Sequence, residues 1–253
     1  TRLPVNNEDV TELNFQGQEF GPVEVTLVAA ATSTLAALTS LQCGSNPLVR
    51  KNTQGGEYTP DAKTFGELCH SLKASQVTDL DFSKCGLGPI SVNHLSDWVR
   101  DATAAVESID LSGCKLTGAT PKHGDSKYGW ENIDSNMDGF IALCAVLGKV
   151  RTVRLADCGL GASSVAELSK IFSDATAALT RTCLLNNPLG EGVNEIIKVF
   201  EETPTLRTLC GFEEGVQQID WKDSGKGVAD VVLLAAELKA CRAVTAVNSL
   251  ILD

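Results

Sequence analysis

The stretch VTDLDFSKCGLG, residues 77–88, returns almost unchanged as VESIDLSGCKLTG at residues 106–118. The shared phrase reads apolar, x, x, apolar, x, apolar, x, x, Cys or Asn, x, apolar. It also fits a segment that starts at Val150 and looser copies that start at Leu38 and Leu179. Recurrence of one phrase along the chain indicates an internal repeat, which decides the fold before any single element is assigned.

The spacing of the copies gives the repeat length. The two ends of the chain extend the series, because the segments that start at Thr11 and Gln217 align with each other without a gap. The second apolar position of each copy falls at Leu13, Leu41, Leu80, Ile109, Val153, Thr182, Leu209, Ile219 and Val247. The base period is therefore 28 or 29 residues, with two longer steps and one shorter step.

Each repeat is predicted to hold one strand and one helix. The apolar, x, apolar core is typical of a short strand, and the remainder has helical spacing, as in Leu168, Ile171 and Phe172. A strand and a helix within 28 or 29 residues cannot bury an apolar face alone. We therefore expect successive units to stack and to share one core.

This pattern resembles the leucine-rich repeat family, in its ribonuclease-inhibitor-like subclass. The resemblance implies an α/β solenoid, curved like a horseshoe, with a parallel β-sheet on the concave face and helices on the convex face. It implies a single domain over residues 1–253 of about eight to nine repeats. The Cys or Asn at positions 46, 85, 114, 158 and 187 would lie inside the turns and satisfy backbone groups.

Composition and charge exclude several classes of function. The chain has 253 residues, 43% of them apolar, and a net charge of -11, which disfavours nucleic acid and anionic lipid as partners. No apolar run reaches the roughly 18 residues that a membrane span needs. Nine cysteines without metal spacing favour reduced thiols in an intracellular compartment. We expect the cytoplasm, or a plastid or other organelle after loss of a targeting peptide.

The polar strand positions predict a bipolar concave face. Side chains alternate across a strand, so these residues point away from the helices. From the third strand onward they are Asp79, Asp81, Glu107, Asp110, Arg151, Arg154, Arg181 and Arg207. Either these charges compensate one another as a solvated salt-bridge ladder, or they bind a partner with a matching charge pattern, to which arginine offers bidentate contacts.

The two longer steps predict loop insertions near residues 49–63 and 118–137. The first is rich in turn-forming residues and should be exposed. The second carries Tyr128 and Trp130 in an otherwise polar run. These aromatic side chains either anchor a partner or fold back to cover the flank of the solenoid.

The second insertion also holds a partial calcium motif. Asp134, Asn136 and Asp138 match the first half of a calcium-binding loop, but Ala145 stands where the bidentate glutamate belongs. The segment after Gly139 has the composition of an ordinary helix, for which Asp138 is available as a cap. We therefore favour capping over metal binding.

No arrangement of residues predicts catalysis or a cofactor, so we expect a protein that is not an enzyme. The main hypothesis is a scaffold that binds one or more protein partners through its concave face and edge loops. The alternative is an accessory subunit of a large, possibly organellar, assembly, whose terminal repeats pack on a neighbouring subunit. A third hypothesis is a GTPase-activating or inhibitor-type regulator, because the same repeat subclass is similar to that of activators of a nuclear-transport GTPase.

Overall fold

Six short strands form a parallel sheet whose order follows the chain. The computed structural model describes residues 9–52, 56–174 and 176–252. The strands are β1 (Glu12–Asn14), β2 (Ser40–Gln42), β3 (Asp79–Asp81), β4 (Ser108–Asp110), β7 (Thr152–Arg154) and β8 (Arg181–Cys183). The register aligns their central residues in one row, from Leu13 to Thr182. The predicted alignment of these six repeats is therefore confirmed.

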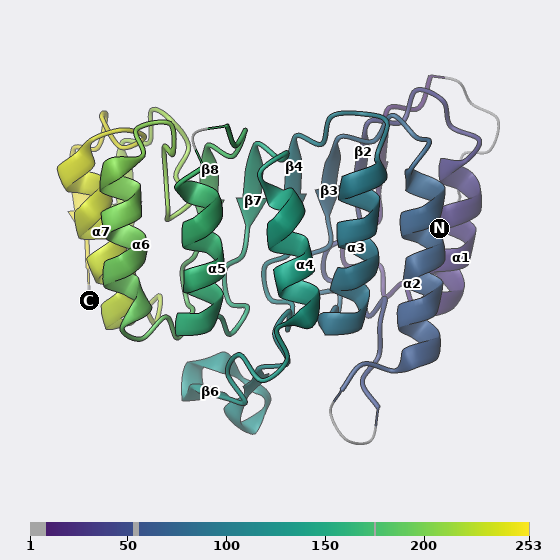
Figure 1. Ribbon diagram of the computed structural model, residues 1–253, viewed down its shortest axis with the longest axis horizontal. Helices are drawn as coiled ribbons and strands as arrows, with labels where there is room; N and C mark the ends of the chain where they lie inside the picture. Colours follow the sequence, from purple (N-terminus) through teal and green to yellow (C-terminus); the bar gives the residue numbers. More distant parts are fainter. Residues whose placement is uncertain (1–8, 53–55, 175, 253) are drawn as a thin grey trace.

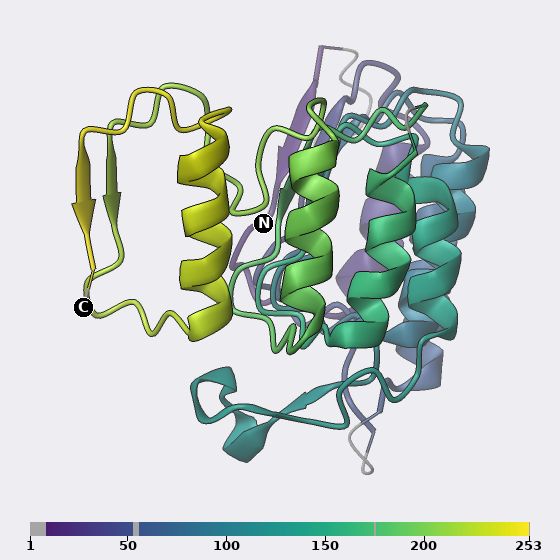
Figure 2. The same cartoon turned by 60° about the vertical axis from the view of Figure 1, so that its left-hand side comes forward.

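The helices connect the strands and lie along one face of the sheet (Figures 1 and 2). They are α1 (Pro22–Thr32), α2 (Thr59–Leu72), α3 (Pro89–Asp101), α4 (Asp138–Leu147), α5 (Ala162–Phe172), α6 (Gly192–Glu202) and α7 (Val228–Ala240). Parallel strands require such crossover connections. The chain thus adopts an α/β fold with one layer of strands and one layer of helices.

The core lies between these two layers. The central strand residues, such as Leu41 and Ile109, are fully buried against helix side chains that include Phe65, Trp98 and Phe140. Burial of each such side chain stabilises the fold by about 1.5–3 kcal/mol. Since every helix packs beside its sequence neighbour, the core runs continuously along the row of repeats.

The cysteines after the strands form a ladder of hydrogen bonds between repeats. The Cys85 thiol donates to the carbonyl of Cys43 at 3.1 Å, and Cys114 donates to Phe82 at 3.2 Å. In the next repeat, the Cys158 thiol donates in the same way to the carbonyl of Leu111 at 3.3 Å. Burial raises the pKa of Cys114 to about 11, so this thiol keeps the proton that it donates at neutral pH. The predicted structural role of these residues is confirmed.

Asn46 and Asn187 satisfy more backbone groups than a thiol can. The Asn187 amide donates to the carbonyls of Leu155 and Leu184 at 2.8 and 2.9 Å. Its oxygen accepts hydrogen bonds from two backbone N–H groups of the preceding repeat, at 2.9 and 3.0 Å. Asn46 likewise donates to the carbonyls of Phe15 and Cys43, and its oxygen accepts the N–H of Phe20. Both amides are buried and bridge neighbouring repeats.

The end of the chain departs from the predicted series. Strands β9 (Gln218–Asp220) and β10 (Ser249–Ile251) pair with each other in a separate parallel sheet, set apart from the main sheet in Figure 2. The strand predicted at Leu209 is reduced to isolated bridges. The reason is that the Glu237 carboxylate takes the backbone N–H groups of Leu209 and Cys210.

The predicted strand centre at Val247 is also wrong. Leu250 is the residue that pairs with Ile219. The Val247 N–H instead bonds to the carbonyl of Val244 in a turn that precedes the strand. The apolar pattern alone did not separate this turn residue from a strand residue.

The two insertions emerge at the same end of the helices, but their structures differ. The first is shorter than predicted, because α2 begins at Thr59 within the range 49–63. Its described residues make an antiparallel bridge between Lys51 and Glu57, and residues 53–55 lie outside the described part. The second folds into the antiparallel pair β5 (Thr120–Pro121) and β6 (Trp130–Glu131), joined by the 3₁₀ turns η1 (Lys122–Gly124) and η2 (Ser126–Tyr128).

The cysteines are free thiols in the structure. Of the nine, Cys241 is exposed, Cys183 is half-buried and the others are buried. In the described part of the chain, no helix is both long and apolar enough to cross a bilayer.

Candidate functional site

The candidate site is the face of the six-stranded sheet opposite the helices, here called the open face. On each strand the central residue is buried toward the helices and its two neighbours point the other way, half-buried or exposed. One outward row runs through Glu12, Ser40, Asp79, Ser108, Thr152 and Arg181, and the other through Asn14, Gln42, Asp81, Asp110, Arg154 and Cys183. Each row changes from acidic to basic as the strands advance.

The acidic half contains Asp79, Asp81 and Asp110. Asp81 Oδ1 accepts the N–H of Ser83 at 2.8 Å, and Asp110 Oδ1 accepts that of Ser112 at 2.8 Å. These Asx turns close the chain as it leaves each strand, so both side chains have a structural role as well. Within the described residues, none of the three aspartates forms an ion pair.

Glu107 and Arg151 link the acidic and basic halves. Their side chains form an ion pair at 3.0 Å just before β4 and β7. Among the eight predicted face residues, this is the one ion pair within the described part of the chain. A continuous salt-bridge ladder between the aspartates and the arginines is therefore absent from the described residues.

The other arginines bind glutamates that the sequence pattern did not indicate. Arg154 and Arg181 both contact Glu213, each at 2.9 Å. Arg207 contacts Glu214 at 3.3 Å. Both glutamates belong to residues 211–215, here called the glutamate strap. This loop follows the irregular repeat, in which the strand around Leu209 is reduced to isolated bridges. The signal available in the sequence was the pair of adjacent glutamates in a five-residue segment that begins and ends with glycine.

Trp130 folds back onto the body of the protein. Its ring lies under the Lys115 ammonium at 4.3 Å, and burial lowers the pKa of that lysine. A Cβ atom on Gly159 would lie only 2.7 Å from the ring, so glycine at this turn lets the indole approach the backbone. Trp130 is thus a covering residue, whereas Tyr128 is 57% exposed and stays available for contact.

The residues of the partial calcium motif are engaged elsewhere. Asp134 accepts the N–H of Gly161 at 3.1 Å and those of Ser163 and Ser164 at 2.9 and 3.2 Å, and so caps α5. The described residues include no group of three or more His, Cys, Asp or Glu side chains arranged to hold a metal ion.

The other two residues of the motif lie at the start of α4. Asn136 Oδ1 accepts the N–H of Asp138 at 3.3 Å. Asp138 is the first helical residue and not the cap, since the N-cap position is Met137 and no side chain there bonds to the helix. The expected capping role of Asp138 is therefore wrong, and the capping residue of the motif is Asp134.

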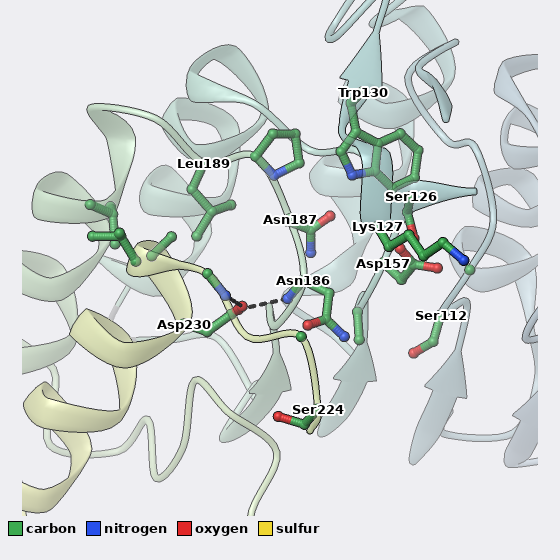
Figure 3. Close-up of a pocket in the computed structure, with 18 of the residues that line it drawn as sticks. Ser112, Ser126, Lys127, Trp130, Asp157, Asn186, Asn187, Leu189, Ser224 and Asp230 are labelled. Carbon is green, nitrogen blue, oxygen red and sulfur yellow. Dashed lines mark hydrogen bonds between the residues drawn. The ribbon is translucent and has the colours of Figure 1, made fainter. Parts of the chain in front are cut away.

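A groove of about 840 Å³ runs along the edge where the strands end. It lies between the second insertion, the turns after β4, β7 and β8, and the N-terminus of α7 (Figure 3). Trp130 and Lys127 line one wall, and Asp230 lines the other, where its carboxylate accepts the N–H of Asn186 at 2.7 Å. This groove borders the open face and belongs to the edge loops.

Comparison with known proteins gives little further guidance. No protein-family model matches the chain, and no curated protein sequence matches it. Many solved structures are similar to it in part, and two of them illustrate the level of similarity. One is the actin-binding site 2 of Leiomodin-1, with 10% identity, a TM-score of 0.37, and 78% of this chain and 84% of that chain covered. The other is the tropomodulin C-terminal domain of Caenorhabditis elegans, with 8% identity, a TM-score of 0.39, and 78% and 86% covered.

These matches correct the expected family resemblance. The aligned structures are a leiomodin and a tropomodulin domain, so the assignment to the ribonuclease-inhibitor-like subclass is wrong. At these TM-scores the similarity assigns neither a family nor a function to the chain.

Proposed function

We propose that this protein is a non-catalytic scaffold that binds a protein partner through the open face and the neighbouring edge loops. The partner's charge pattern would be the reverse of that face. The repeat units would form one domain, a curved solenoid that presents a broad surface instead of a deep active-site pocket.

The observation that carries the proposal is the charge change along one row of the open face. Asp81, Asp110 and Arg154 are successive partners in the register of β3, β4 and β7. Neighbouring strands lie about 4.8 Å apart, so the change from carboxylate to guanidinium occurs between Asp110 and Arg154, within a row of three residues that spans roughly 10 Å. A surface of this kind orients a partner, because charges placed in the wrong order repel.

The state of the two charge clusters supports the proposal. The three aspartates on the acidic half form no ion pair within the described residues. The ion-pair partners of Arg154, Arg181 and Arg207 are glutamate side chains that are 63–69% exposed. Exposed ion pairs contribute only about 0–1 kcal/mol each, so a partner can bind the unpaired aspartates and can exchange with the glutamates on the basic half.

The free thiols favour a reducing compartment as the place where this binding occurs. Seven cysteines are buried without a disulfide, and the ladder of thiol donors needs protonated sulfur at Cys85, Cys114 and Cys158.

The experiment compares two double variants as bait in an extract of the native source. Asp81→Asn with Asp110→Asn removes two charges from the open face, yet keeps an oxygen for each Asx turn. Glu67→Gln with Glu195→Gln removes two charges from exposed positions on α2 and α6. A partner of the open face is retained by wild type and by the helix variant, and lost by the open-face variant. Equal retention by all three proteins would refute the proposal.

A further inference from the structure

The basic half of the open face is already occupied by carboxylates of the same chain. Glu213 bridges two adjacent strands, with Oε1 bonded to Arg154 of β7 and Oε2 bonded to Arg181 of β8, both at 2.9 Å. Glu214 contacts Arg207 at 3.3 Å. The carbonyl of Phe212 accepts a further hydrogen bond from Arg181. One short segment therefore contacts three guanidinium groups, of which Arg207 also donates to the carbonyl of Arg242 at 2.7 Å.

The glutamate strap is built as a loop with a glycine at each end. Gly211 and Gly215 have φ values of +78° and +85°, which side-chain-bearing residues rarely adopt. A Cβ on Gly211 would lie 2.8 Å from that of Cys183, so the root of the strap must approach β8 closely. Its tip reaches into solvent, where Glu213 is 69% and Glu214 is 63% exposed at the side chain.

We propose that Arg154, Arg181 and Arg207 are the docking site for a partner segment that carries two adjacent carboxylates, and that the glutamate strap occupies this site in the free protein. This inference rests on the proposed function, because it names the partner chemistry of the open face. The strap acts as an internal competitor, which the partner's carboxylates replace one for one.

Charge complementarity fixes which partner fits and in which direction. Guanidinium groups are strong hydrogen-bond donors to carboxylates, and Glu213 already accepts one hydrogen bond from each of Arg154 and Arg181. A partner segment that continued with further acidic residues toward β4 and β3 would meet Asp110 and Asp81 and be repelled. The segment that fits thus has two carboxylates over β7 and β8, and a basic group roughly 10 Å away over the aspartates.

Exchange is feasible because the internal contacts are weak. Glu213 and Glu214 form surface ion pairs, which are partly screened by solvent and salt. While the strap occupies the arginines, a partner cannot bind them. The apparent affinity for the partner is therefore lowered by roughly the ratio of protein with the strap bound to protein with the strap released. For surface pairs of this strength we expect that ratio to be on the order of threefold to tenfold.

The test uses the strap's own sequence as the probe, the synthetic peptide Gly-Phe-Glu-Glu-Gly-Val. Its dissociation constant is measured by NMR titration at low salt against wild type and against Glu213→Gln with Glu214→Gln. We expect the double variant to bind the peptide about threefold to tenfold more tightly. Adding Arg154→Gln and Arg207→Gln should abolish that binding, and a Gly-Phe-Gln-Gln-Gly-Val peptide should not bind. Glu195→Gln on α6 is the matched control and should behave as wild type.

Two outcomes would overturn the inference. One is equal affinity of wild type and the strap variant for the acidic peptide. The other is equal binding of the acidic and the glutamine peptides, a comparison made on one folded protein that stays decisive if an arginine variant is unstable. Loss of an extract partner by the Asp81 and Asp110 variant, together with either outcome, would leave the proposed function intact and remove this inference alone.

Discussion

Asp134 in the second insertion caps the N-terminus of α5 by binding Ser164. The Ser164 hydroxyl donates to Asp134 Oδ1 at 2.5 Å, and the Ser164 N–H donates to Oδ2 at 3.2 Å. Glu57 in the first insertion makes the same pair of bonds to Ser91 of α3. Both helices start after a glycine, which offers no side chain as a cap. The insertions therefore supply the carboxylates that these helices lack.

Replacing Asp134 with Ala should destabilise the protein by about 1 kcal/mol, within the usual range of about 0.5–2 kcal/mol for a lost cap. The reason is that three backbone donors at the start of α5 lose their acceptor. Urea unfolding measures the change, and Glu131→Gln, an exposed residue of the same insertion, is the control. A loss that appears only when calcium is present would instead support the metal hypothesis.

Replacing Glu57 with Ala should cost a similar amount at α3. Its carboxylate accepts the N–H of Ile90 at 2.6 Å and that of Ser91 at 3.1 Å. Glu67→Ala on the exposed side of α2 is the matched control, since it removes the same side chain without uncapping a helix. Equal unfolding free energies for the two variants would show that the first insertion contributes nothing to capping.

The repeat period correctly predicted which residues form the buried row from Leu13 to Thr182 and which side chains beside it point outward. The prediction succeeded because each stacked strand has only one register that buries its apolar residue. The glutamate strap could not be predicted in the same way. Residues 211–215 lie outside the periodic pattern, so no neighbouring copy indicates where Glu213 points. The caps from Glu57 and Asp134 were missed for the same reason, since each depends on a loop path that sequence spacing does not determine.

The register makes a sharp prediction at two adjacent residues. Leu155 is fully buried, and its replacement by Ala should cost about 2–5 kcal/mol by leaving a cavity. Arg154 lies on the open face, where its contact with Glu213 is solvent-exposed, so Arg154→Ala should cost no more than about 1 kcal/mol. Thermal unfolding monitored by circular dichroism compares the two. Similar losses would mean that the assigned faces are wrong.

Replacing Asn187 measures how much its side-chain amide, in the turn after β8, contributes to the free energy of unfolding. Replacement by Ala removes the Asn187 amide from three carbonyls and two N–H groups, and should cost roughly 3 kcal/mol. Asn187→Cys places there the residue that other repeats use at the same position, as at Cys158, and should recover part of the loss through one thiol bond. Unfolding in urea ranks the three proteins. A cysteine variant no better than the alanine variant would contradict the equivalence of these turns.

We expect the free energy of unfolding to depend on pH through Glu237, which connects α7 to the irregular repeat. Burial raises the pKa of its carboxyl, whose Oε1 accepts the Thr208 hydroxyl at 2.7 Å and the Cys210 N–H at 2.5 Å. Its Oε2 is buried and has no hydrogen-bond partner among the described residues. The folded structure therefore favours the neutral form of this carboxyl more than the unfolded chain does.

Because the pKa of Glu237 is higher in the folded than in the unfolded chain, its stabilising contribution is fully present below the unfolded value of about 4.3. That contribution is lost as the pH rises through the folded value, at no more than about 1.4 kcal/mol per pH unit. Glu237→Gln stays neutral, so its unfolding free energy should fall less than that of wild type between pH 4.5 and 8. Glu195→Gln on α6 controls for the change in net charge. Parallel curves for wild type and Glu237→Gln would show that this carboxyl titrates alike in both states.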